Sequence, residues 1–525
     1  MIDILKKPND SEVNIICEGG ENIDAKVRIE PVGDKLQVWL TADKSFPEFV
    51  MLRWNQHITK HVKIMGDTWA VACANMCWRT IVPDRFMPWY FLADFGSEIV
   101  GCGVMVRPNS FVSFECDSRG VTAWFDVRCG ARGVQLGGRE LLIGTIVSKK
   151  YTDITPFEAT CEFCKVMCED PIFPKEPIYG FNNWYYAYGK STGEQVRKDA
   201  ALVAELCEGN ENRPFMVIDD CWTKELTAGP WLPNEEFGDM KKIADDFKNM
   251  GVRPGLWIRL LKDPEFAQGH PEYLIHADNA TGGQLDPSHP AVKEYIKETV
   301  SRVKSWGYEL LKYDYTSADI FKPGGTARNG MITTHGTWAF YDRTKTSAEI
   351  VLDFYKLIKE TAGDMLLLGC GTISHLCAGL VEINRIGDDT SGKTWSRTRS
   401  LGVNSLAFRL PQNGTFYTID ADCVGIMGEG VPNIPWKLNV QWTKLLAYSG
   451  SPLFVSCHPD LATKEIKDDL TKYLAINSIQ KDTAIPLDWQ DNMNPERWLI
   501  NGEEVEFDWI CDSYPLLIPN FDQPN

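Results

Sequence analysis

The sequence of 525 residues lacks several features that would assign it to a class at once. No hydrophobic run is long enough to span a membrane, and the opening MIDILKKPNDSEVNIICEGG has neither the apolar stretch nor the cleavage site of a secretory signal. The net charge is −18 and no cluster of lysines and arginines interrupts it, which argues against a nucleic-acid partner. We therefore expect a cytoplasmic protein that binds neither nucleic acid nor membranes.

Metal-site spacings are also scarce. The 16 cysteines, without an export signal, are expected to be free thiols in a reducing compartment. Cys161, Cys164 and Cys168 have no second ligand cluster, and their spacing places them on one apolar face of a helix. His57 and His61 could be ligands four residues apart on a helix, but a strand or loop without an acidic third ligand fits them better. We expect no metal and no cofactor.

The pattern of short segments divides the chain into three parts. Residues 1–170 contain short β-branched and aromatic runs separated by Gly, Asn and Asp, followed by an amphipathic helix at Thr155–Cys168. This pattern predicts an N-terminal β-sandwich. Pro171, Pro174 and Pro177 then form a stiff linker.

Residues 175–460 alternate buried strands with helices, one of which begins at a capping box made by Ser191 and Glu194. Eight strands with crossover helices predict a (β/α)8 TIM barrel. A doubly wound sheet is the alternative, but GFNNWYYAYG after the first strand is not a Gly-rich phosphate turn. From about Lys464 we expect short strands and turns that form a small antiparallel β domain over residues 464–525. The predicted fold class is α/β, a barrel flanked by two β domains.

Charged and polar residues gather where the predicted barrel strands end. Because these ends share one mouth, their side chains are expected to converge there. Lys312 and Asp314 point to the same side of their strand, since side chains alternate. The residues at these ends are Asp219, Asp220, Trp257, Lys312, Asp314, Cys370, Arg385, Asp388, Asp389, Asp420 and Asp422.

Each of these residues also has a structural interpretation. Asp219 or Asp220 could cap the following helix, Lys312 and Asp314 could form an ion pair, and Arg385 could pair with Asp388 or Asp389. Burying all these charges at one rim without a function is costly. Two opposed carboxylates without a cofactor are typical of glycoside hydrolysis, and a nearby lysine keeps a nucleophilic carboxylate ionised.

Six short motifs occur in one order: VIDD, GLWI, KYD, LGCG, RIGDD and DADC. In these motifs the chain resembles glycoside hydrolase family 36, the α-galactosidases, and is related in its barrel to family 27. The resemblance implies Asp314 as the nucleophile and Asp389 as the acid/base, with Asp388 as second choice.

The resemblance also implies a set of substrate-binding residues. Asp219 and Asp220 match the pair that binds the 4- and 6-hydroxyls of galactose, and Trp257 lines the same subsite. Cys370 and Gly371 match the loop near the 2-hydroxyl, and Arg385 matches a residue that binds sugar hydroxyls. Trp184 and Trp89 are candidates for the aromatic wall. Arg259 departs from the family pattern and, if it points into the mouth, could select an anionic sugar. Asp319 has no partner in this scheme and is expected at the surface.

The expected activity is that of a retaining exo-α-galactosidase acting on oligosaccharides or other glycosides, with self-association possible. The alternatives within the family are an α-N-acetylgalactosaminidase, another α-glycosidase or a transglycosidase. A sugar-binding protein without catalysis, a Schiff-base aldolase using Lys312 and a metal-dependent barrel using the aspartates remain as other classes.

Overall fold

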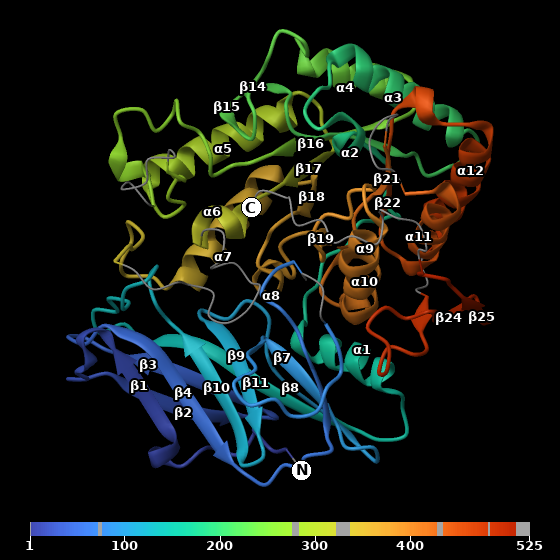
Figure 1. Cartoon of the computed structure of the whole chain (residues 1–525). Helices are drawn as coiled ribbons and strands as arrows, with labels where there is room; N and C mark the ends of the chain where they lie inside the picture. The colour runs from blue at the N-terminus through green and yellow to red at the C-terminus, as the bar shows by residue number, and fades with distance from the viewer. Residues whose placement is uncertain are drawn as a thin grey trace.

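The computed structural model describes residues 2–71, 76–275, 283–321, 337–427, 434–480 and 484–510. Two antiparallel sheets form the N-terminal part (Figure 1). In strand order, the first consists of β1 (Val13–Cys17), β4 (Pro47–Asn55), β10 (Gly120–Asp126), β9 (Phe111–Asp117) and β6 (Met87–Pro88). The second consists of β2 (Lys26–Val32), β3 (Lys35–Thr41), β11 (Leu141–Tyr151), β8 (Ile99–Val104), β7 (Tyr90–Asp94) and β5 (Lys63–Gly66).

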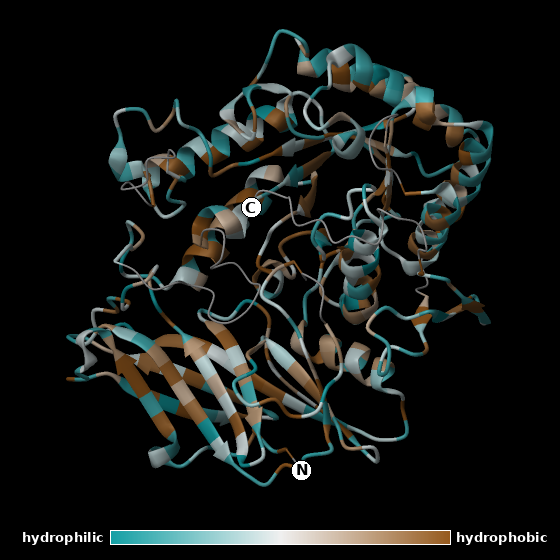
Figure 2. Cartoon of the chain, in the orientation of Figure 1, coloured by the Kyte–Doolittle hydropathy of each residue, from teal (hydrophilic) through white to brown (hydrophobic). Residues whose placement is uncertain are grey.

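Alternation along the strands explains this pairing of sheets. In β3, Leu36, Val38 and Leu40 are fully buried, whereas the residues between them are partly exposed. Figure 2 shows apolar and polar bands alternating along the strands of this part of the chain. One apolar face per sheet favours face-to-face packing, as the sequence pattern predicted.

A parallel sheet curls into the predicted barrel. Its order is β20-β19-β18-β17-β16-β13-β12-β22-β21. The strands are β12 (Tyr179–Asn182), β13 (Phe215–Ile218), β16 (Arg253–Ile258), β17 (Leu310–Tyr313), β18 (Leu366–Gly369), β19 (Ile383–Arg385), β20 (Thr418–Asp420), β21 (Val424–Ile426) and β22 (Leu453–Cys457). Most of these residues are buried, as expected for strands covered on both faces.

The ninth strand arises because the seventh is broken. Residues Thr418–Asp420 pair with β19, and Val424–Ile426 pair with β22, so the two pieces together close the barrel. Between them Asp422 has a φ of 80°. A left-handed conformation at a residue other than glycine is uncommon and often marks a functional site.

Helices cover the barrel on the outside. They are α3 (Gly193–Leu206), α4 (Met240–Asn249), α5 (Pro290–Ser305), α7 (Ser347–Ala362), α11 (Trp436–Ser449) and α12 (Lys464–Ile479). Shorter helices at the strand ends are α2 (Trp184–Ala187), α6 (Thr316–Phe321), α8 (Ser374–Cys377), α9 (Trp395–Arg397) and α10 (Asn404–Arg409). None of the helices among the described residues has the length and apolar character that crossing a bilayer requires.

Two helix predictions require correction. The N-cap of α3 is Thr192, whose hydroxyl accepts from the backbone N–H of Gln195, and not Ser191. Lys464–Ile479 form helix α12 and not short strands, because Thr463 caps a segment whose apolar side packs on α11 and α3.

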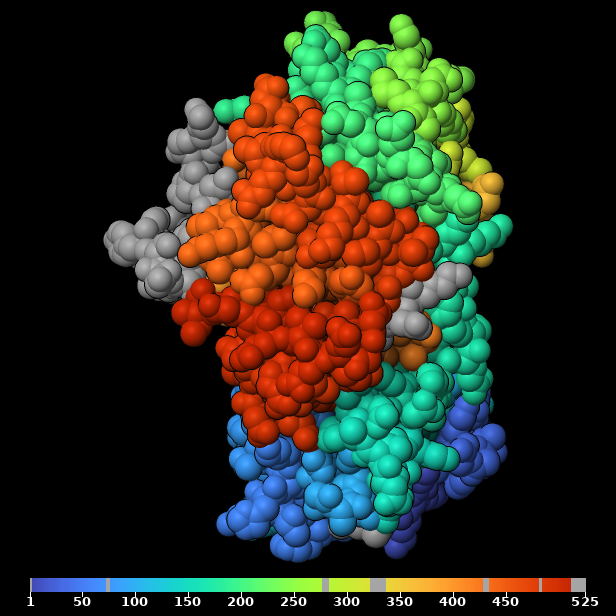
Figure 3. All heavy atoms as spheres, turned by 90° about the vertical axis from the view of Figure 1, so that its right-hand side faces the viewer, coloured from blue at the N-terminus to red at the C-terminus, as the bar shows by residue number. Residues whose placement is uncertain are grey.

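Strands in the C-terminal region begin only after α12. The small sheet contains β23 (Ile485–Pro486), β24 (Arg497–Ile500) and β25 (Glu503–Glu506), and residues after 510 lie outside the described part. Trp489 contacts Trp78 of the N-terminal part and Phe408 of the barrel. Figure 3 shows this red C-terminal region lying between the barrel and the blue N-terminal sheets.

A buried junction joins the sandwich to the barrel. Helix α1 (Pro156–Met167), capped by Thr155, lies against β8, β11 and the turn at residues 410–412. At this junction the guanidinium of Arg409 lies 3.0 Å from the carboxylate of Asp67, and neither side chain is more than 1% exposed. One hydrophobic core runs through both parts, so the sandwich and the barrel stabilise each other.

Candidate active site

A pocket of about 470 Å³ opens where the barrel strands end. Its volume lies in the range of small-ligand sites. In TIM-barrel enzymes, this end of the barrel is where substrates bind. Residues from most of the strand ends line it, together with one residue of the sandwich, Val71. The barrel residues are Asn182, Trp184, Tyr185, Asp219, Asp220, Trp257, Lys312, Asp314, Tyr315, Ser317, Ala318, Cys370, Gly371, Arg385, Gly387, Asp388, Asp389, Asp422 and Cys423.

Asp314 follows β17 and is fixed by two N–H donors. The indole Nε1 of Trp257 donates to Oδ2 at 3.1 Å, and the backbone N–H of Tyr315 donates to Oδ1 at 2.6 Å. Each carboxylate oxygen therefore has a partner that sets its direction. The carboxylate is held at the pocket wall in one orientation.

Lys312 pairs with a different carboxylate from the one the sequence suggested. Its Nζ lies 2.7 Å from Oδ2 of Asp219, which also accepts from the side-chain amide of Asn182 at 2.7 Å. Burial opposes the charge, yet the neighbouring Asp219 raises the pKa of Lys312 well above its usual value. The charge of Asp314 raises the pKa of Lys312 as well, but less than that of Asp219. Lys312 and Asp314 therefore do not form the ion pair that their spacing left open: the ammonium contacts Asp219 at the end of β13, which is separated from β17 by one strand.

Asp220 offers the pocket an unused acceptor. Its Oδ1 accepts from the backbone N–H groups of Cys221 at 2.7 Å and Thr227 at 3.2 Å. Its Oδ2 is buried and has no hydrogen-bond partner within the described ranges. Burial, assisted by the charge of Asp219, raises the pKa of Asp220 to about 7. A buried polar atom without a partner is costly, and a ligand hydroxyl would satisfy it.

Asp389 lines the pocket, and 45% of its side-chain surface is exposed. Its Oδ1 lies 3.1 Å from Nη2 of Arg385. Burial and the charge of Asp422 raise the pKa of Asp389 to about 6, although Arg385 opposes them. A raised pKa keeps a carboxyl group protonated closer to neutral pH, so that it can donate a proton there.

Asp388 also lines the pocket. Adjacent side chains on an extended strand point in opposite directions, yet Asp388 and Asp389 both line the pocket. The backbone bends at Asp388, after the end of β19, so strict alternation no longer applies. Oδ1 of Asp388 accepts the backbone N–H of Asp389 at 2.8 Å and lies 3.8 Å from Arg397.

Asp422, at the end of a barrel strand, also lines the pocket. Its Oδ2 lies 2.6 Å from Arg385, and it accepts from the backbone N–H of Thr390 at 2.7 Å and from the hydroxyl of Tyr185. Although burial opposes it, Arg385 and Tyr185 lower the pKa of Asp422, so the group stays anionic. The strand-end rule also applies to Asn182, the last residue of β12, and could have identified it. Nothing in the sequence pointed to Val71, because it comes from another part of the chain.

The loop after β18 comes close to Asp314. Gly371 has a φ of 65°, and a Cβ there would lie 3.3 Å from the backbone nitrogen of Tyr315 and 3.5 Å from Oδ1 of Asp314. Cys370, next to it, is buried among the pocket residues. Glycine at 371 therefore permits both the left-handed turn and the close approach to Asp314.

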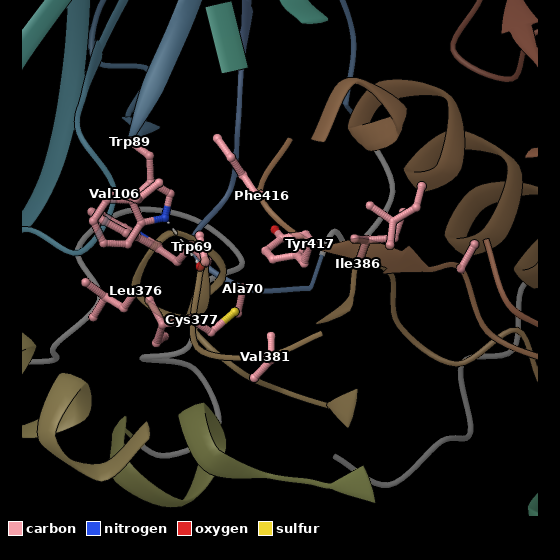
Figure 4. Packing of buried hydrophobic residues seen from close by; sticks show 14 of the residues in the cluster. Trp69, Ala70, Trp89, Val106, Leu376, Cys377, Val381, Ile386, Phe416 and Tyr417 are labelled. Carbon is pink, nitrogen blue, oxygen red and sulfur yellow. Dashed lines mark hydrogen bonds between the residues drawn. The ribbon is translucent and has the colours of Figure 1, made fainter. Parts of the chain in front are cut away.

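Trp89 is not part of the pocket. It is fully buried, its ring stacks on His375 with centroids 5.0 Å apart, and its Nε1 donates to the carbonyl oxygen of Trp69 at 3.4 Å. Figure 4 shows Trp89 beside Trp69 in the packing between sandwich and barrel. Trp89 therefore does not form an aromatic wall of the pocket, as the sequence led us to expect. It is a core residue of the junction between sandwich and barrel.

Arg259 does not line the pocket either. Its Nε lies 2.9 Å from Oδ2 of Asp319 and its Nη2 lies 2.5 Å from Oδ1. Asp319 is 1% exposed, so its assignment to the surface is wrong. The carboxylate already neutralises Arg259, so this guanidinium is not available to bind an anionic sugar.

Metal-ligating side chains do not gather in the described ranges: no group of three or more His, Cys, Asp or Glu residues there could hold an ion. Cys161 and Cys164 lie on α1, and His57 and His61 lie in the loop after β4. Lys312 is held as a charged ammonium, which does not suit a Schiff-base nucleophile.

Comparisons with solved structures identify the fold of this chain, whereas comparisons of its sequence find no match. No family model matches the sequence, and no curated protein matches it. The chain has the fold of the α-galactosidase TtGalA from Thermus thermophilus, with a TM-score of 0.62 and 17% identity over 96% of this chain and 100% of that chain. That protein was solved with p-nitrophenyl α-D-galactopyranoside and with stachyose.

Two further solved structures share the fold. The family 36 α-galactosidase AgaA from Geobacillus stearothermophilus has a TM-score of 0.62 and 14% identity, covering 93% of this chain and 79% of that chain. The α-galactosidase from Lactobacillus brevis has a TM-score of 0.58 and 11% identity, covering 89% and 72%. The family 36 fold, with its N-terminal sheets, barrel and small C-terminal sheet, thus extends over most of this chain.

Proposed function

We propose that this protein is a retaining exo-glycosidase that removes terminal α-linked galactose, with Asp314 as nucleophile and Asp389 as acid/base. The observation that carries the proposal is the unequal environment of two carboxyl groups that line one pocket. Asp314 receives an N–H donor on each oxygen, whereas the pKa of Asp389 is raised to about 6 by burial and by Asp422. Glycoside hydrolysis requires this division between a nucleophile and an acid.

In the proposed reaction, Asp314 attacks the anomeric carbon while Asp389 gives its proton to the leaving oxygen. The bond from the anomeric carbon to that oxygen breaks, and the sugar becomes an ester of Asp314. Asp389, now ionised, takes a proton from water, and the water oxygen displaces Asp314. Two inversions give net retention, which requires carboxyl groups about 5–5.5 Å apart.

The charged base of the pocket suits a ring with several hydroxyls. Asp219, which is paired with Lys312, has two carboxylate oxygens that can accept hydrogen bonds. Oδ2 of Asp220 lacks a partner within the described ranges. Each can accept from a sugar hydroxyl. We propose Asp219, Asp220, Trp257, Arg385 and the Cys370–Gly371 loop as the glycone site, with Trp184 at its wall.

Galactose is proposed as the glycone because a protein of the same fold was solved with an α-galactoside and with stachyose. The proposed location is the cytoplasm, where the free thiols of the described chain would stay reduced.

The test is a panel of p-nitrophenyl α-glycosides of galactose, N-acetylgalactosamine, glucose and a uronic acid. We expect turnover of the galactoside and none of the uronide, since Arg259 is already paired with Asp319. Faster turnover of the N-acetylgalactosamine substrate would reassign the glycone. Binding of galactose without turnover of any substrate would overturn the proposed reaction.

A further inference from the structure

Tyr315 stands beside the proposed nucleophile in a strained conformation. Its φ is 62°, in the left-handed region. This conformation is costly for an aromatic residue, and residues that adopt it are often found at functional sites. Its backbone N–H donates to Oδ1 of Asp314, and its side chain lines the pocket. Tyr315 is nevertheless 38% exposed. The chain therefore holds a large ring at the pocket with part of its surface open.

A buried ion pair lies against one face of this ring. The guanidinium carbon of Arg259 lies 4.1 Å from the centre of the Tyr315 ring. Arg259 is itself fixed by bidentate hydrogen bonds to the carboxylate of Asp319, which is 1% exposed. A buried ion pair is expensive to form and contributes little net stability on its own. Here it places a flat cation against one face of Tyr315, so the ring is kept in position.

Tyr315 is more exposed than Trp257, the aromatic side chain that it contacts in the pocket. Trp257 is 2% exposed, and its indole donates to Asp314. The ring of Tyr315 packs edge-on against Trp257, with centroids 6.5 Å apart, and is the more exposed of the two. In an exo-acting pocket the sugar that is cleaved off lies deep and the leaving group lies outward.

We infer that Tyr315 is the platform for the leaving-group sugar, and that Arg259 and Asp319 are positioning residues for its ring. The inference rests on the proposed function and adds its substrate class: α-galactosides whose leaving group is a sugar with an apolar face. Such a face stacks on an aromatic ring, whereas a small leaving group such as fluoride has nothing to stack.

The experiment compares kcat/KM for stachyose and for α-galactosyl fluoride in Tyr315→Ala, Tyr315→Phe and the wild type. We expect Tyr315→Ala to lose about tenfold on stachyose, the scale of one aromatic contact. The value for the fluoride should stay within about twofold, and Tyr315→Phe should restore the stachyose value because the ring is kept. Tyr341→Ala, which removes a tyrosine that is 58% exposed outside the pocket, is the matched control and should change neither.

The positioning role has its own variant. Arg259→Met combined with Asp319→Leu removes both charges together, so no buried charge is left unpaired. We expect this double variant to lose activity selectively on stachyose, by less than Tyr315→Ala does. Equal losses on both substrates in Tyr315→Ala would overturn the inference and leave the proposed function intact. No turnover of either substrate by the wild type would instead overturn the proposed function itself.

Discussion

The guanidinium of Arg385 lies 2.6 Å from the carboxylate of Asp422, and both side chains are 2% exposed. The same Nη2 atom lies 3.1 Å from Asp389. Arg385 is therefore shared between a carboxylate that stays anionic and the proposed acid/base, and the anion at Asp422 offsets much of the positive charge that Asp389 would otherwise experience. Asp388 and Arg397 also act on Asp389: Asp388 raises its pKa and Arg397 lowers it.

This arrangement predicts how pH controls activity. Asp389 must carry a proton to act as an acid, and its pKa is about 6, so kcat/KM should fall as the pH rises through about 6. Asp422→Asn removes the anion that raises this pKa and leaves Arg385 uncompensated. The alkaline limb of the pH profile should then move to lower pH, by about one unit. Asp199→Asn removes a buried carboxylate that pairs with Tyr186 outside the pocket, and it should leave the limb in place.

Loss of the proposed nucleophile can be read from product stereochemistry. Asp314→Ala should abolish turnover, and azide should restore it by occupying the space of the missing carboxylate, which yields the inverted glycosyl azide. With an activated substrate, Asp389→Ala plus azide should give the retained azide. NMR of the products distinguishes the two anomers. A retained azide from Asp314→Ala would mean that the two roles are exchanged.

The Lys312–Asp219 pair predicts a stability effect. Lys312→Met leaves the Asp219 carboxylate buried without its cation, and the free energy of unfolding should fall by about 3–5 kcal/mol. Combining Lys312→Met with Asp219→Asn should recover part of that loss, because no charge is left unpaired. Urea unfolding measures both. Additive losses in the double variant would argue against a direct coupling between the two side chains.

Gly371 allows backbone strain to be separated from crowding at Asp314. Gly371→Ala and Gly414→Ala both place a Cβ on a left-handed residue, with φ values of 65° and 69°. Each should cost about 1–2 kcal/mol of stability. Only the Cβ at 371 meets neighbours, Tyr315 and Asp314, whereas the one at 414 has nothing within 4 Å. We therefore expect kcat to fall at least tenfold in Gly371→Ala alone, and a similar fall in Gly414→Ala would refute this explanation.

Much of the architecture could be predicted from local patterns. Alternating burial in β3 and continuous burial in β12 and β13 reflect the two kinds of sheet, and both patterns are visible in the sequence. The rule that barrel strands end at a common mouth predicts that Asp219, Asp314 and Arg385 lie together, and all three line one pocket. Helix α12 could not be predicted in this way, because its amphipathic pattern is weak and its buried side packs on the preceding helix α11 and on the distant helix α3.

The choice of partner could not be predicted in the same way. Lys312 and Asp314 share a face of β17, but the ammonium contacts Asp219 on another strand. Asp319 had no neighbour in sequence that explained it, yet it is buried against Arg259.

The sequence by itself determined the strands, the barrel and the group of polar residues that meet at its mouth, because these depend on periodicity and on where strands end. Only the tertiary structure decided which charges neutralise each other, that Trp89 belongs to the core and that Tyr315 is held at the pocket. Pairing and depth depend on distances between segments far apart in the chain, which residue spacing does not specify.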